Sequence, residues 1–75
     1  MRLRIIDTNF TSNYDWLFKL IDENDNQYYI MDDAFYKRHN CKSPITKNEL
    51  DYYEKGQWIA ASVINLEERK IVIGA

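Results

Sequence analysis

The sequence predicts one small, mainly β domain with a single short helix, spanning residues 1–75. Three observations support this fold class. Apolar and polar residues alternate with a period of two in several segments, as in half-buried strands. Only two Gly and one Pro occur, so each marks a definite turn. Two Trp, six Tyr and three Phe supply the large side chains that so short a chain needs to build one core.

Residues 2–10 and 14–21 predict the first two strands. Alternation in the first places Leu3, Ile5 and Asp7 on the face that is buried at its start. The second is apolar on both faces, which indicates a central strand or a strand at an interface. Its two expected faces are Trp16, Phe18 and Leu20 on one side, with Leu17 and Ile21 on the other.

Residues 27–31 predict a third strand. The polar segment 22–26 has the length of a hairpin loop, so this strand is expected to pair with the second. The next segment, residues 32–44, has no clear pattern, because Ala34–Tyr36 fits either a helical turn or the end of a strand. We therefore assign no element to it.

A helix is predicted over residues 47–55. Thr46 and Glu49 have the spacing of a capping box, in which each side chain bonds a backbone N–H near the start of the helix. Gly56 follows where a left-handed C′ residue ends many helices. The residues expected to face inward are Leu50 and Tyr53.

Residues 57–64 and 70–73 predict the last two strands, separated by a charged turn. The order is then strand, strand, strand, helix, strand, strand. This order, the chain length and the passage from the helix through Gly56 to Trp58 resemble the OB-fold, a five-stranded barrel. The resemblance covers nearly the whole chain but is architectural, without a signature motif. An SH3-like barrel and an open α+β sheet are the alternatives.

The distribution of charge suggests a binding function. The chain has a net charge of −2, yet the segment from Ala34 to Asn48 holds four basic residues, His39 and no acid. Single-strand binders combine cations that follow the phosphates with aromatic rings that stack on bases. The OB-like resemblance implies that the second and third strands form the binding surface. Candidate contacts with single-stranded nucleic acid are Lys19, Tyr28, Tyr29, Tyr36, Lys37, Arg38, Lys42 and Lys47, and further charge could come from Arg2, Arg4, Arg69 and Lys70.

A protein-interaction module is the alternative function: a small subunit, an adaptor or an inhibitor from a mobile element. The second strand has more apolar residues than one small barrel can enclose. Its surplus face, Leu17 and Ile21, could dock on a protein partner or pair two copies. If neither binding function holds, the basic segment is a solvated loop that keeps the protein soluble.

The acidic turn raises the question of a metal site. Asp22, Asn24 and Asn26 have EF-hand-like spacing, with Asp33 at the twelfth position. Gln27 stands where that loop requires glycine, and strands are expected on both sides where helices are needed. Asn and Asp are also the residues that hairpin turns favour. We expect a turn here, and no metal or other cofactor.

Enzymatic activity is not expected. His39 and Cys41 lie two residues apart, but no other His or Cys exists to complete a zinc site, and no third group is evident to orient a catalytic pair. The two glycines are too far apart for a phosphate-binding loop. With one cysteine, no apolar run of membrane-spanning length and no signal-peptide pattern, we expect a cytoplasmic protein.

Overall fold

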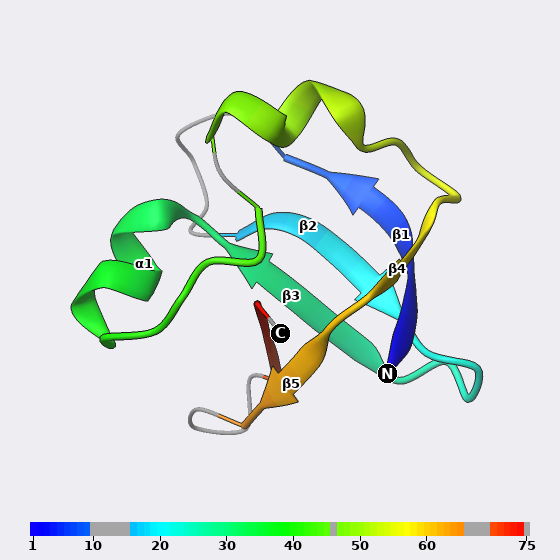
Figure 1. Cartoon of the computed structure of the whole chain (residues 1–75). Helices are drawn as coiled ribbons and strands as arrows, with labels where there is room; N and C mark the ends of the chain where they lie inside the picture. The colour runs from blue at the N-terminus through cyan, green and yellow to red at the C-terminus, as the bar shows by residue number, and fades with distance from the viewer. Residues whose placement is uncertain (10–15, 46, 66–69, 75) are drawn as a thin grey trace.

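The computed structural model describes residues 1–9, 16–45, 47–65 and 70–74, with backbone only for residues 47 and 48. Within these ranges the chain is mainly β with one short α-helix, as the sequence predicts. The strands are β1 (Arg2–Thr8), β2 (Trp16–Ile21), β3 (Gln27–Met31), β4 (Trp58–Ala60), β5 (Ser62–Ile64) and β6 (Ile71–Ile73). The helices are α1 (Asp33–Arg38) and a 3₁₀-helix, η1 (Lys47–Tyr52). Figure 1 shows η1, in yellow-green, crossing above the curled sheet.

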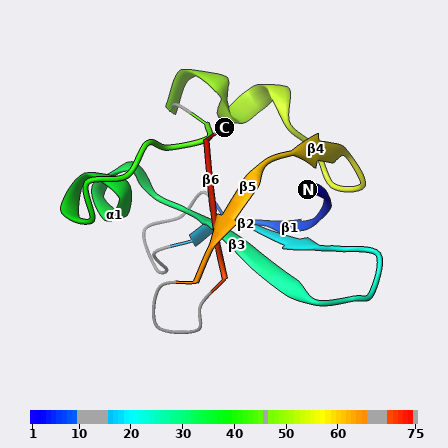
Figure 2. The same ribbon diagram turned by 60° about the horizontal axis from the view of Figure 1, so that its bottom comes forward.

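The six strands form one sheet in the order β4-β1-β2-β3-β6-β5. β3 and β6 run parallel, and the other neighbouring strands are antiparallel. β4 and β5 form the two edges, although only Ala61 separates them in the chain. The sheet is therefore strongly curled into a half-barrel. The β4–β5 segment passes from one edge to the other (Figures 1 and 2).

Ala61 marks the bend between the two edges. Its backbone N–H donates to the carbonyl of Met1 (2.9 Å), whereas the next residue, Ser62, pairs with Ile73 of β6. The alanine is buried, so its small side chain suits a tight change of direction. The predicted strand over 57–64 is thus two short strands, and the sheet has six strands where the sequence predicts five.

Alternating apolar residues of the strands fill the inside of the curl. Directly opposed residues share one face of a sheet, so Ile5, Leu20 and Tyr28 form a single inner row. Phe18 and Ile30 are opposed in the next row. Full burial of each such side chain contributes about 1.5–3 kcal/mol to stability. The buried core is Leu3, Ile5, Phe18, Leu20, Tyr28, Ile30, Met31, Phe35, Tyr36, Ile45, Ala61, Ile71 and Val72.

Tyr36 attaches α1 to the sheet. Its side chain is 1% exposed. The hydroxyl donates to the carbonyl of Val72 in β6 (2.6 Å) and accepts from the N–H of Met31 in β3 (3.0 Å). Burial raises the pKa of Tyr36 far above its usual value, so the hydroxyl remains a donor at any physiological pH. One side chain therefore links the helix to two strands that are distant in the chain.

Helix α1 lies in the segment to which the sequence analysis assigns no element. Asp32 caps it, since its carboxylate accepts from the N–H of Phe35 (2.8 Å). Asp33 stands in the first turn and two cations, Lys37 and Arg38, in the last, which complements the helix dipole. The capping residue and the charges at the two ends can be recognised in the sequence, and together they indicate a helix.

The predicted helix over 47–55 is instead the shorter 3₁₀-helix η1. Thr46, one half of the expected capping box, lies outside the described residues. The inward positions are confirmed, because Leu50 and Tyr53 pack against the core. Gly56 adopts a positive φ of 88°, as the prediction of a left-handed residue requires. A segment this short gains little from α-helical hydrogen bonds, and 3₁₀-helices are typical of such pieces.

Two β-bulges change which residues share a face. In β1 the register shifts between Ile5 and Asp7, and in β2 it shifts between Trp16 and Phe18. Each bulge adds one residue and so reverses the alternation beyond it. Asp7 consequently leaves the face of Ile5, and Trp16 leaves the face of Phe18. The sequence assignment of both residues by strict alternation is wrong for this reason.

Candidate functional site

The surface of the curled sheet that points away from the core carries aromatic rings and cations together. The register defines two neighbouring outer rows: Trp58, Arg4, Ile21 and Gln27 in one, and Asp7, Lys19 and Tyr29 in the other. Arg2 precedes Arg4 by two residues and therefore shares its side. We call these two rows, together with Arg2 and Trp16, the outer face. Its charged groups are three cations and one carboxylate, on a chain whose net charge is −2.

The first cluster of the outer face is Trp16, Lys19 and Tyr29. The two rings lie 6.0 Å apart between centroids, tilted by 52°. The ammonium of Lys19 lies 5.4 Å from the centroid of Trp16 and 6.0 Å from that of Tyr29. Both distances are within the range of a cation–π interaction. The bulge in β2 creates this cluster, because it turns Trp16 toward Lys19.

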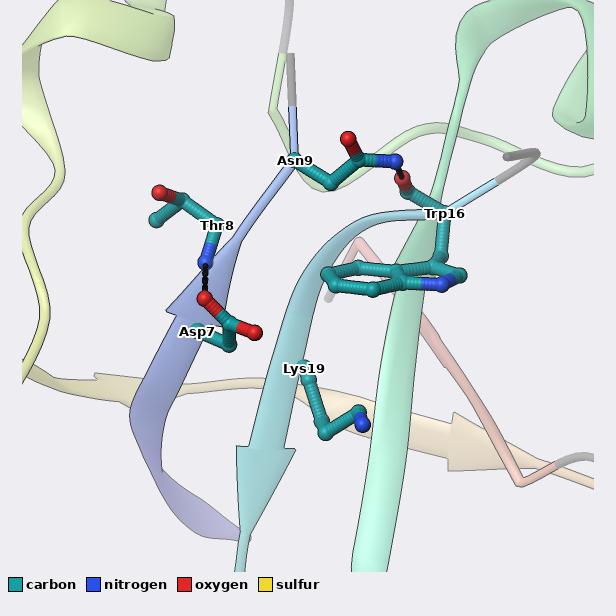
Figure 3. Close-up of a pocket in the computed structure, with 5 residues that line it drawn as sticks. All are labelled: Asp7, Thr8, Asn9, Trp16 and Lys19. Atoms are coloured by element: carbon teal, nitrogen blue, oxygen red, sulfur yellow. Dashed lines mark hydrogen bonds between the residues drawn. The ribbon is translucent and has the colours of Figure 1, made fainter. Parts of the chain in front are cut away.

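An open pocket of about 390 Å³ adjoins this cluster (Figure 3). Trp16 and Lys19 line it from β2, and residues 7–9 line it from the end of β1. The side-chain amide of Asn9 donates to the carbonyl of Trp16 (3.2 Å), which ties the start of β2 to β1. The pocket offers an indole face, an ammonium and several polar groups, a set suited to a ligand that is both flat and anionic.

The carboxylate of Asp7 is already engaged. It accepts from the N–H of Thr8 (2.9 Å) and forms an ion pair with Lys55 (3.5 Å). Within the described ranges, no carboxylate oxygen lies within 4.0 Å of the cationic groups of Arg2, Arg4 or Lys19. These three cations therefore contact aromatic rings and solvent, and can turn toward an anionic ligand.

The second cluster of the outer face is Trp58 with Arg2 and Arg4. The guanidinium groups lie 5.7 Å and 5.8 Å from the centroid of the indole. Arg4 is directly opposite Trp58 in the antiparallel pair of β1 and β4. Trp58 is 42% exposed, which is unusual for the largest apolar side chain. Arg2, Trp58 and Glu23 line a smaller pocket of about 150 Å³.

The structure separates the two tyrosines that the sequence analysis nominated side by side. Tyr29 belongs to the outer face, whereas Tyr28 is 7% exposed and belongs to an inner row. Its hydroxyl donates to the carboxylate of Asp22 (2.8 Å), and this bond raises the pKa of Tyr28. Tyr36 is buried as well. Neither Tyr28 nor Tyr36 offers a ring face to a base, so both leave the candidate set.

In the basic segment, the rings of Phe35 and Tyr36 are buried while the described cations stay in solvent. Lys37, Arg38 and Lys42 are exposed, and the side chain of Lys47 lies outside the described residues. The guanidinium of Arg38 lies 6.0 Å from the ring of Phe35, but that ring is buried in the core. This segment can attract phosphates through charge, but its Phe35 and Tyr36 rings are buried, and the exposed imidazole of His39 is the ring it presents, packed on Phe35 at 4.4 Å between centroids. Two further residues were named as sources of positive charge. Arg69 lies outside the described residues, and Lys70 is exposed with its ammonium 5.5 Å from the centroid of the Tyr28 ring.

The two residues predicted to form a protein interface lie in different environments. Leu17, the bulged residue of β2, packs against the core. Ile21 is half-buried and lies in the outer face, opposite Arg4. Only Ile21 therefore remains available to a partner on that face.

The acidic loop between β2 and β3 is organised as a turn. The carboxylate of Asp22 accepts from the N–H groups of Asn24 (2.8 Å) and Asn26 (3.0 Å) and from the Asn26 side chain (3.1 Å). Limited desolvation opposes ionisation, but these bonds and that from Tyr28 outweigh it and lower the pKa of Asp22 to about 2. In the part of the chain that is described, no three acidic, His or Cys side chains gather as metal ligands would.

The candidate contacts named from the sequence include neither the half-buried Trp16 nor the exposed Trp58. Strict alternation placed Trp16 on the same face as Phe18 and Leu20, and no local pattern in the sequence indicates a bulge. Trp58 could have been found from its position directly after Gly56 and Gln57, where a strand begins at a sheet edge. Arg2 and Arg4 were considered only as additional charge, because their aromatic partner comes from a strand more than fifty residues away in the chain.

Comparisons with protein-family models, with curated proteins and with solved structures find no match to this chain. Across the described residues, no helix is long and apolar enough to span a membrane.

Proposed function

We propose that this protein is a non-catalytic module that binds single-stranded nucleic acid on the outer face of an OB-like barrel. One observation carries the proposal: the outer face pairs three cations with three aromatic rings, of which one is exposed and two are half-buried. Bases stack on exposed aromatic rings, and cations follow the phosphates between them. The rings are Trp16, Tyr29 and Trp58, and the cations are Arg2, Arg4 and Lys19.

The strand connections support the OB-like assignment. If β4 and β5 are counted as one strand bent at Ala61, five strands remain, with the helices between the third and the fourth. The two edges of the sheet are then two halves of one strand, which is what a nearly closed barrel requires. In such barrels the outer side of the second and third strands binds oligonucleotides. In this chain that side holds Lys19 and Tyr29.

The cation–π contacts suggest how a base replaces a cation on each aromatic ring when the oligonucleotide binds. In the free protein, each cation occupies the face of a ring that a base would use. An arriving base displaces the cation, and the displaced group turns to the neighbouring phosphate. One flexible Lys or Arg thus shields the ring in the free protein and binds the backbone in the complex.

Fluorescence anisotropy of a labelled single strand tests the proposal. A strand of about eight thymidines suits the roughly 4–16 nucleotides that one such barrel covers. Three phosphate contacts give a slope of about −2 for log K against log salt, so binding should weaken ten- to twentyfold between about 50 and 200 mM salt. No binding even at the lower salt concentration contradicts the proposal, because the phosphate contribution is largest there.

A protein partner on the same face is the second candidate, favoured by the half-buried Ile21 among the outer residues. An Ile21→Lys variant separates the two functions. A fourth cation on the face should strengthen oligonucleotide binding, whereas a lysine in an apolar contact should loosen protein association. Sedimentation of the variant and of the unchanged protein at high concentration measures any self-association directly.

A further inference from the structure

A second pocket on the outer face has a chemical composition different from the first. Arg2 of β1, Trp58 of β4 and Glu23 of the β2–β3 turn line it, and its volume is about 150 Å³. It therefore combines a flat apolar surface, a guanidinium that only donates hydrogen bonds and a carboxylate that only accepts them. A carboxylate is unexpected in a site that serves only to attract phosphates.

The carboxylate of Glu23 is not occupied elsewhere in the described structure. No described cation lies within 4.0 Å of it, including its pocket neighbour Arg2. It also does not take part in the hydrogen bonds of its turn, which converge on Asp22. The side chain is thus free to accept hydrogen bonds from a ligand in the pocket.

We propose that this pocket binds a guanine base of the single strand, an inference that rests on the proposed function. Guanine presents two adjacent donors, N1–H and N2–H₂, on its Watson–Crick edge, and a carboxylate accepts both at once. On its other edge it presents the acceptors O6 and N7, which a guanidinium binds in a bidentate manner. Glu23 and Arg2 fill these two roles, with Trp58 as the stacking surface.

The other bases match the pocket less well. Adenine and cytosine each offer Glu23 a single amino group. Thymine offers only its ring N–H, and the two carbonyl oxygens beside that N–H repel a carboxylate. Stacking alone does not distinguish the bases, because every base has an aromatic face. The carboxylate therefore provides the selectivity, and the indole provides affinity that all bases share.

The two guanidinium groups near Trp58 allow this arrangement. A base that stacks on the indole displaces one of them, and the other remains within reach of the pocket. Along β1, the five steps from Arg2 to Asp7 separate the two pockets by roughly 16 Å at about 3.3 Å per residue. One short oligonucleotide can thus occupy both pockets, with a guanine base in the pocket beside β4.

The test compares four labelled strands that are identical except for one central base: guanine, adenine, cytosine or thymine in a thymidine background. The unchanged protein should bind the guanine strand about five- to tenfold more tightly than the thymine strand. In Glu23→Gln this preference should fall below about twofold, while affinity for the all-thymidine strand is unchanged or slightly higher. Asp25→Asn is the matched control, because it removes the same charge from the same turn outside the pocket and should keep the preference.

The outcomes separate the two proposals. Equal binding of all four strands by the unchanged protein, or a guanine preference that survives in Glu23→Gln, overturns the guanine pocket and leaves the proposed function intact. If no strand binds at low salt, the proposed function is wrong, and the guanine pocket with it. Both variants change exposed turn residues, so loss of folding is not expected to obscure the result.

Discussion

Two regions of this protein combine aromatic residues with cations, and the fold arranges them differently: in α1 they are neighbours in the chain, whereas on the outer face most of them come from different strands. In α1, Phe35 and Tyr36 turn into the core while Lys37 and Arg38 remain in solvent. On the outer face of the sheet, aromatic rings and cations point the same way and contact one another. Neighbouring residues of an amphipathic helix separate by polarity, whereas cross-strand neighbours share a face whatever their polarity. Only the second arrangement makes a surface for a flat anionic ligand.

The largest expected effect lies in α1 and concerns stability alone. Tyr36→Phe removes the hydrogen bonds that the Tyr36 hydroxyl makes with the N–H of Met31 and the carbonyl of Val72, which should lower the free energy of unfolding by about 3 kcal/mol. Oligonucleotide affinity of the folded protein should not change. Urea denaturation measures the loss, and Tyr52→Phe, at an exposed tyrosine, serves as the control with no expected change.

The corresponding change on the outer face should affect binding. Trp16→Leu keeps an apolar side chain against the core but removes the ring that a base would stack on. Affinity for the thymidine strand should fall about tenfold, in the range of about 1–3 kcal/mol per stacked base. Anisotropy measures this fall under conditions where the variant is shown to be folded. An unchanged affinity would mean that Trp16 is only a packing residue.

A smaller effect distinguishes the cations of the two regions. Lys19→Met should reduce the slope of log K against log salt by about 0.7, because one phosphate contact is lost. Lys37→Met removes the same charge from α1 and should leave the slope unchanged. If the two variants change the slope equally, Lys37 of α1 contacts the oligonucleotide as directly as Lys19 of the sheet. The outer face would then not be the preferred binding surface.

The smallest expected effect concerns stability at acidic pH. It arises in β3, where Tyr28 faces the core and its neighbour Tyr29 belongs to the outer face. Tyr28 points inward and holds the carboxylate of Asp22, whose pKa is lowered from 3.8 to about 2. Because the pKa is lower in the folded protein, this contribution to stability is present above about pH 4 and is lost as the pH falls toward 2. Asp22→Asn should therefore show a flatter loss of stability over this interval. Denaturation of both proteins at several acidic pH values tests the difference, and parallel curves would contradict it.

The sequence was sufficient for the elements that depend on local pattern. Period-two alternation located the three long strands, and the positive φ of Gly56 followed from its place after a helical segment. Helix α1 could also have been identified, since Asp32, Asp33 and the two cations of its last turn form a cap and a complemented dipole. The parallel pairing of β3 with β6 and the bend at Ala61 depend on contacts between distant segments, for which the sequence contains no local signal.

The candidate site was less predictable than the fold, because two bulges define its first cluster and the pairing of two strands distant in the chain defines its second. The bulges in β1 and β2 move Asp7 and Trp16 to the other side of the sheet, and alternation gives no warning of either. Lys19 and Tyr29 were nominated because of the resemblance to OB-folds, and the structure brings them together. The nominated cations of the basic segment and the buried Tyr28 and Tyr36 show that nearness in sequence does not indicate a shared surface.

Heteronuclear NMR of the ¹⁵N-labelled protein, titrated with the thymidine strand, tests the central claim most directly. Both tryptophans of the chain belong to the outer face, so their two indole N–H signals report on that face alone. We expect these signals to shift on titration together with the amide signals of Lys19 and Tyr29, while the amide signals of Lys37 and Arg38 change little. Shifts confined to α1, or no shifts at all, would contradict the assignment of the outer face as the binding surface.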